Sequence, residues 1–119
     1  MKFDFLFSRK KKNQQVNPIV IELDRIRQLP QDDSGFTTIF GTPFHFHHAA
    51  SFLVTYKELF EDELYKFNPT TPENGIILDC GANMGLSVLY FSLHYPNLQI
   101  IAFEPEEAVF EILKENVHN

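Results

Sequence analysis

The stretch Ile76-Ile77-Leu78-Asp79-Cys80-Gly81-Ala82-Asn83-Met84-Gly85 decides the fold of this 119-residue chain. Its first half is apolar up to one carboxylate, and its second half is a short turn that holds two glycines. A helical apolar pattern follows at once, so the stretch predicts a buried strand, a tight loop and the start of a helix. That order is typical of the first crossover in a parallel α/β sheet.

A second strand is predicted downstream at Ile100-Ile101-Ala102-Phe103, and Glu104 closes it. Asp79 and Glu104 therefore each lie where a predicted strand ends. Ligands of open α/β sheets bind outside the carboxyl ends of the strands. The sequence thus predicts a nucleoside-type pocket with acidic walls.

Two amphipathic helices are expected to follow the two strands. Pro96 ends the first helix because proline lacks an N–H group and clashes with the preceding turn. Pro105 opens the second, whose first turn carries Glu106 and Glu107, as suits a helix N-terminus. The expected buried stripes are Leu86, Leu89, Tyr90 and Leu93 in the first helix, and Val109, Ile112, Leu113 and Val117 in the second.

The residues before Ile76 predict a lead-in made of a helix, a β-hairpin and a longer helix. Apolar residues recur at helical spacing after Pro18, namely at Ile19, Leu23 and Ile26. The hairpin is expected to pair residues 36–40 with 44–48 across a Gly-Thr-Pro spacer. A second amphipathic helix is expected from Ala49 to about Lys66. Its predicted stripe is Phe52, Tyr56, Leu59, Phe60 and Leu64.

These patterns divide the chain into three segments. We expect a basic tail over residues 1–18, the lead-in over 19–75, and the first two βα units of a ligand-binding domain over 76–119. The tail is expected to be solvated, since chain termini usually are. Aromatic residues beside its basic cluster would give at most weak, reversible binding to an anionic membrane surface.

Composition excludes several classes of protein. The first 12 residues hold five basic side chains and one acid, yet the chain carries a net charge of −6. The acidic remainder disfavours binding to nucleic acid. A single cysteine permits no internal disulfide, and no run reaches the ~20 apolar residues of a membrane helix. We expect a cytoplasmic protein with no stable membrane anchor.

Three histidines lie in and beside the predicted hairpin. His45 and His47 share a face of the second strand, because side chains alternate along a strand, and His48 follows. No third ligand with suitable spacing is visible. We therefore interpret these histidines as structural or surface residues and assign no metal site.

The central loop is suited to a ligand that carries both charges. Its glycines let the backbone approach a ligand closely, and the following helix offers free N–H groups and a positive dipole end to a carboxylate. Asp79 favours an ammonium or a hydroxyl group, and Glu104 is placed to accept hydrogen bonds from a ribose diol. S-adenosylmethionine has all these groups and no phosphate.

The main rival is a nicotinamide dinucleotide. Its fingerprint G-x-G-x-x-G has a glycine in the middle position, where the backbone approaches the pyrophosphate. Here that position is Asn83, whose side chain would crowd the pyrophosphate, and Asp79 would repel it. A further alternative is a purely structural βαβ turn in which Asp79 caps the neighbouring helix.

The chain resembles the FkbM-type methyltransferases. In that family an aspartate, a Gly-Ala-Asn-x-Gly loop and a Phe-Glu-Pro segment follow one another at this spacing. The stretches that carry the resemblance are Asp79-Cys-Gly-Ala-Asn-Met-Gly-Leu-Ser, Tyr95-Pro96, Ala102-Phe103-Glu104-Pro105 and Glu115-Asn116-Val117, with 51–53 and 56–60 upstream. The resemblance covers about residue 36 to the C-terminus.

The resemblance implies S-adenosylmethionine as cofactor and O-methylation of a sugar or natural-product hydroxyl. It implies that the methionine end is lined by Asp79, Gly81, Ala82, Asn83 and Gly85, and that Glu104 holds the ribose. It also implies the start of a Rossmann-like sheet of the class I methyltransferase type. No catalytic residue is assigned.

The family's domain continues with further strands and helices, so we expect this chain to be an N-terminal portion of an enzyme, inactive alone. The acceptor pocket and any general base would then lie downstream. The alternative is a folded module without catalysis. Because parallel sheets normally have both faces covered, we expect the open sheet edge to favour self-association.

Overall fold

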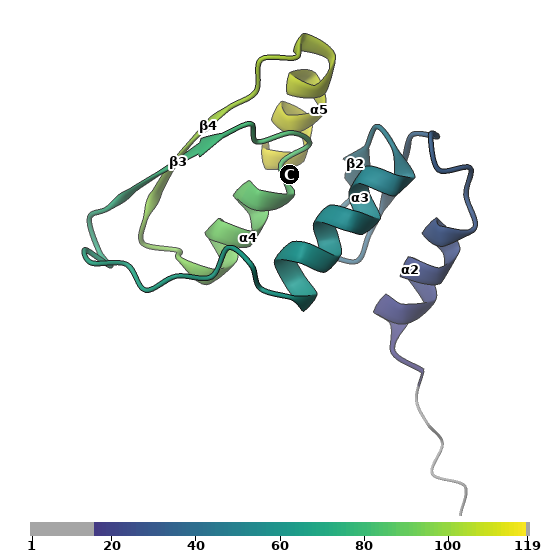
Figure 1. Cartoon of the computed structure of the whole chain (residues 1–119), viewed down its shortest axis with the longest axis horizontal. Helices are drawn as coiled ribbons and strands as arrows, with labels where there is room; N and C mark the ends of the chain where they lie inside the picture. The colour runs from purple at the N-terminus through teal and green to yellow at the C-terminus, as the bar shows by residue number, and fades with distance from the viewer. Residues whose placement is uncertain (1–15, 119) are drawn as a thin grey trace, which may run out of the picture.

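The computed structural model describes residues 16–118, which form an α/β structure with two small sheets (Figure 1). In chain order the elements are α2 (Pro18–Arg27), β1 (Gly35–Thr37), β2 (Phe44–Phe46), α3 (Ala49–Tyr56), the π-helical turn η1 (Lys57–Glu61), β3 (Ile76–Cys80), α4 (Leu86–His94), β4 (Gln99–Phe103) and α5 (Glu107–His118).

The first helix, α2, begins where the sequence predicts it. Asn17 caps it by accepting the Ile19 N–H at 3.0 Å, and Pro18 occupies the first turn. Leu23 and Ile26 are buried as expected, whereas Ile19 stays exposed. The helix includes Pro18, which was predicted to belong to the tail. Of the other tail residues, Val16 is exposed and Asn17 is the N-cap, and residues 1–15 lie outside the described part.

No helix within residues 16–118 has the length and the apolar character that crossing a lipid bilayer requires.

The hairpin is confirmed, but its strands are shorter than predicted. β1 and β2 pair antiparallel with Gly35 opposite Phe46. Strand β1 ends after Thr37 because the next residues form a turn, in which the Gly41 N–H donates to the Thr38 carbonyl at 2.9 Å and Gly41 has a φ of +89°. The second strand stops at Phe46, since His48 already takes the N-cap position of α3.

The predicted helix from Ala49 to Lys66 is wrong at its C-terminal end. The α-helical part stops at Tyr56, and the π turn η1 ends at Glu61. In that turn the Asp62 N–H donates to the Lys57 carbonyl at 2.8 Å, five residues back.

The chain then leaves the helix at Glu63, whose φ is +49°. Leu64 was expected in the buried stripe but is 63% exposed. Phe52, Tyr56 and Leu59, which precede the change in backbone, are buried as predicted.

The βαβ unit has the predicted order and direction. β3 and β4 pair in parallel, with Asp79 opposite Ala102 and Cys80 opposite Phe103. Figure 1 shows α4 and α5 beside the same side of this sheet. The carboxyl ends of both strands therefore lie at one edge, next to the loop that leads into α4.

The prediction of a buried strand is correct for one face only. Ile77 and Ile100 pack against the core, whereas Ile76 and Leu78 on β3 are more than half exposed. Ile101 and Phe103 on β4 are exposed beside them. The two helices cover a single face, so alternate residues of both strands remain in contact with solvent.

The buried face of α4 is rotated from the predicted stripe, whereas that of α5 follows its prediction except at Val117. Leu86 and Tyr90 are buried as expected, but Leu93 is 60% exposed and Phe91 is buried instead. The Phe91 ring packs against Tyr65 and Phe67 of the lead-in, with ring-centroid distances of 6.1 and 6.4 Å, which accounts for its burial. On α5, Val109 and Leu113 are buried, Ile112 is partly buried and Val117 is exposed.

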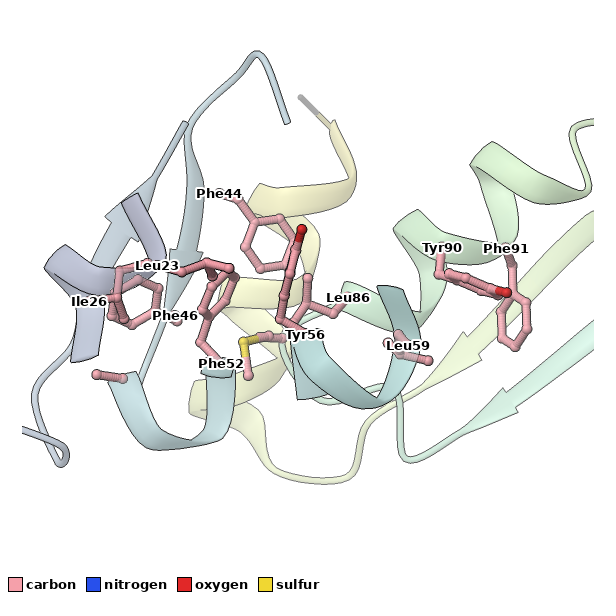
Figure 2. Packing of buried hydrophobic residues seen from close by; sticks show 12 residues of the cluster. Leu23, Ile26, Phe44, Phe46, Phe52, Tyr56, Leu59, Leu86, Tyr90 and Phe91 are labelled. Carbon is pink, nitrogen blue, oxygen red and sulfur yellow. The ribbon is translucent and has the colours of Figure 1, made fainter. Parts of the chain in front are cut away.

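One apolar cluster joins the lead-in to the βαβ unit (Figure 2). The α2, hairpin and α3–η1 residues pack in it together with Met84 of the central loop and three residues of α4. Its buried members are Leu23, Ile26, Phe44, Phe46, Ala49, Phe52, Tyr56, Leu59, Met84, Leu86, Tyr90 and Phe91. The segment before β3 is thus part of the same core as the sheet.

A single amide side chain adds a polar link between these parts. Asn116 on α5 accepts the His45 N–H at 2.7 Å and donates to the His45 carbonyl at 2.8 Å. Its nitrogen also donates to the Met84 carbonyl at 2.7 Å. Asn116 therefore satisfies backbone groups of the hairpin edge and of the central loop together.

We expect Asn116→Ala to lower the free energy of unfolding by about 1–3 kcal/mol, because partly buried backbone groups lose their partners. Urea denaturation measures the change. Glu111→Ala, at an exposed position of the same helix, is the control and is expected to stay within about 0.5 kcal/mol of the parent chain. Equal effects of the two substitutions would show that the Asn116 link contributes nothing.

Candidate ligand site at the carboxyl ends of the parallel strands

The loop after β3 folds back over the end of β4. The N–H groups of Gly81 and Ala82 both donate to the Phe103 carbonyl, at 2.8 and 2.9 Å. Gly81, Asn83 and Gly85 have φ values of +81°, +53° and +99°. Glycine adopts this region without steric cost, and asparagine tolerates it better than most residues. Because every second residue from Gly81 to Gly85 has a positive φ, the chain turns sharply into α4.

Asp79 lies at the base of this loop and is only 8% exposed. Its Oδ2 atom accepts a hydrogen bond from the Ser87 hydroxyl at 2.5 Å. Ser87, in the first turn of α4, is also buried, so the bond fixes the orientation of the carboxylate. Our sequence reasoning missed Ser87, although a serine in the first turn after a glycine loop was a usable signal.

Glu104 ties the loop to the beginning of α5. Its Oε1 atom accepts the Asn83 N–H at 3.0 Å, and its Oε2 atom accepts the Glu106 N–H at 2.9 Å. Each carboxylate oxygen has a further lone pair, so both remain able to accept another hydrogen bond. The carboxylate is half-buried and holds the backbone of Asn83 in its left-handed conformation.

A cavity of about 180 Å³ opens beside the loop and brings four of the six predicted site residues together, Asp79, Gly81, Ala82 and Asn83. Gly85 and Glu104 are outside its lining. The other lining residues are Thr55, Glu58, Leu59, Tyr65, Cys80, Met84, Leu86 and Ser87.

Gly85 lies instead against α5. A Cβ atom at this position would stand 2.8 Å from Leu113 Cδ1. The residue also borders a separate hollow with Asn116 and Val117. Its role in the structure is to let the N-terminus of α4 pack closely on α5.

Part of the cavity lining comes from the lead-in, which our sequence reasoning did not predict. Thr55 and Glu58 stand three residues apart and therefore lie on one helical face, and Tyr65 follows the π turn. Tyr65 stacks on Phe91 with a ring-centroid distance of 6.1 Å. The sequence offered one indication of this lining: Thr55 and Glu58 are polar residues outside the apolar stripe of the helix.

The three histidines lie away from the cavity lining. His45 Nε2 is 3.5 Å from Glu115 Oε1, and the rings of His47 and His48 are 4.7 Å apart. Burial lowers the pKa of His47, and the charge of His48 lowers it further, against the opposing effect of Glu106 and Glu104. Within residues 16–118, no three His, Cys, Asp or Glu side chains gather closely enough to hold a metal ion.

These features define an α/β protein with a cavity at the carboxyl ends of two parallel strands. The chain is 42% identical over 62 residues to Methyltransferase sdnD of Sordaria araneosa, across 52% of this chain and 24% of that protein. It is 39% identical over 66 residues to Methyltransferase 1 of Beauveria bassiana, across 54% and 26% of the two chains.

The chain is also 35% identical over 62 residues to the 31-O-demethyl-FK506 methyltransferase FkbM of Streptomyces tacrolimicus, across 51% of this chain and 24% of that protein. This relationship to methyltransferases, FkbM among them, confirms the resemblance found in the sequence. The chain spans about a quarter of the length of these relatives. No family model and no solved structure matches it.

Proposed function

We propose that this chain binds the methionine end of S-adenosylmethionine and is part of a methyltransferase that acts on a hydroxyl group of a small molecule. The observation that carries the proposal is the cavity in which buried Asp79 stands beneath a glycine loop and beside the start of α4. Its volume of about 180 Å³ is below the roughly 300–1,000 Å³ of whole-ligand pockets, so it suits one end of the cofactor.

The charges around the cavity match a zwitterion. Backbone N–H groups at the start of α4 favour the ligand's carboxylate, because the dipole of the helix is positive there. Asp79 favours its ammonium group. In this proposal Glu104, which already orders the loop, accepts a hydrogen bond from the ribose through its remaining lone pairs.

The cofactor supplies the methyl group, and the residues of this chain bind and orient it. Positioning of two reactants is itself a large part of catalysis. We assign no general base within the chain. Recognition of the acceptor hydroxyl, a Rossmann-like completion of the sheet and a cytoplasmic location stay predictions.

A nicotinamide dinucleotide is a weaker candidate for the same loop. The Asn83 N–H, which stands where the fingerprint places its middle glycine, is bonded to the Glu104 carboxylate and is therefore not free to bind a phosphate. A pyrophosphate would also meet the charge of Asp79 in the cavity lining. The remaining alternative is a folded module without catalysis. Binding of S-adenosylhomocysteine would favour the proposed function over this alternative.

We expect the chain to bind S-adenosylhomocysteine with a micromolar Kd, and Asp79→Asn to weaken binding about 10- to 100-fold, because the ammonium loses a charged partner. Isothermal titration calorimetry measures both values. Asp24→Asn on exposed α2 is the control and should leave the Kd unchanged. No binding by the parent chain, or no effect of Asp79→Asn, would contradict the proposal.

A further inference from the structure

The lead-in contributes an acid of its own to the cavity lining. Glu58 lines the cavity from η1, while Asp79 and Ser87 line it from the βαβ unit. Acidic residues from both the lead-in and the loop thus line the same space.

The backbone of the lead-in places Glu58 there. Thr55 and Glu58 share one helical face and both line the cavity. The π turn that contains Glu58 is closed by the Asp62 N–H donating to the Lys57 carbonyl, and the Leu64 N–H then donates to the Glu58 carbonyl at 2.9 Å. π turns are frequent at functional sites, and here the turn brings Glu58 and Tyr65 to one cavity.

Glu58 forms no ion pair with another described residue, and unlike Glu61, which also forms none, it lines the cavity. Asp62 pairs with Lys57 at 2.6 Å, and Glu63 pairs with Lys66 at 3.4 Å. In the described part of the chain, no Lys or Arg forms an ion pair with Glu58, and no basic residue lines the cavity. The cavity therefore has two carboxylates and no protein cation, which favours a positively charged ligand group.

We propose that Glu58 is a ligand-binding residue that contacts the α-ammonium group of the adenosyl amino acid together with Asp79, from a different element of the chain. This assignment rests on the proposed function. It makes the lead-in one half of the binding site, and it explains why the π turn and Asp79 meet at one cavity.

The test compares two ligands that differ only at the ammonium group. S-adenosylhomocysteine and its analogue with hydrogen in place of the α-amino group are titrated into the chain and followed by NMR shifts. Glu58→Gln is expected to weaken S-adenosylhomocysteine about tenfold and the desamino analogue less than about twofold. Glu61→Gln, on the same turn but outside the cavity lining, should change neither.

Equal weakening of both ligands by Glu58→Gln, or none for either, would overturn the assignment and leave the proposed function standing if Asp79→Asn still weakens binding. No binding of S-adenosylhomocysteine by the parent chain would overturn both. Because Glu58 is exposed, its substitution should not change the thermal midpoint, which circular dichroism checks.

Discussion

Gly85→Ala is expected to lower the free energy of unfolding by about 2–5 kcal/mol. Two costs add at this position. The φ of +99° is in the left-handed region, which costs an alanine about 1–2 kcal/mol. The new Cβ would also stand 2.8 Å from Leu113 Cδ1, and relief of such an overlap in a packed region costs about 1–3 kcal/mol. Chemical denaturation measures the sum.

Gly41→Ala separates the two costs. Gly41 has a φ of +89°, but a Cβ atom at this position would have no neighbour within 4 Å. The substitution should therefore cost only the backbone part, about 1–2 kcal/mol. If both variants lose the same free energy of unfolding, the overlap between the new Cβ atom and Leu113 costs nothing, and the expectation for Gly85→Ala is wrong.

The uncovered face of the β3–β4 sheet is expected to make the isolated chain self-associate. Leu78 is 62% exposed and stands opposite Ile101 in the parallel register. Burying a leucine is worth about 1.5–3 kcal/mol, so Leu78→Glu is expected to raise the dissociation constant of self-association more than tenfold. Analytical ultracentrifugation over a concentration series measures it.

Leu93→Glu is the matched control, because Leu93 is 60% exposed but lies on α4, away from the sheet face. It adds the same charge and should leave self-association largely unchanged. A parent chain that stays monomeric at high concentration would contradict the expectation. An equal effect of both variants would indicate that net charge, rather than this face, controls association.

The sequence was sufficient to predict the order of the elements. Alternating apolar residues, the two glycines of the central loop and Pro96 each act locally, so the strand, loop and helix follow from short-range rules. The same local rules place Asp79, Gly81, Ala82 and Asn83 in one cavity lining, while their role in binding a ligand stays a prediction.

The elements that depend on distant contacts could not be predicted. The helix ends after Glu61 because of a π turn and the left-handed conformation of Glu63. The spacing of apolar residues predicts neither feature. Phe91 is buried where Leu93 was expected, because the rings of Tyr65 and Phe67, which follow the π turn, pack against Phe91. Glu58 joins the cavity for the same reason, since only the tertiary packing brings η1 to the loop.

The apolar cluster shared by α2, the hairpin, α3 and α4 has a practical consequence for anyone who recombines this unit with those of its relatives. A crossover placed in the proline-containing stretch before β3 would combine side chains from two different parents in contacts such as that between Phe60 and Tyr90. A chimera should instead inherit everything from Asn17 onward as one block, so that both halves of the interior come from the same parent.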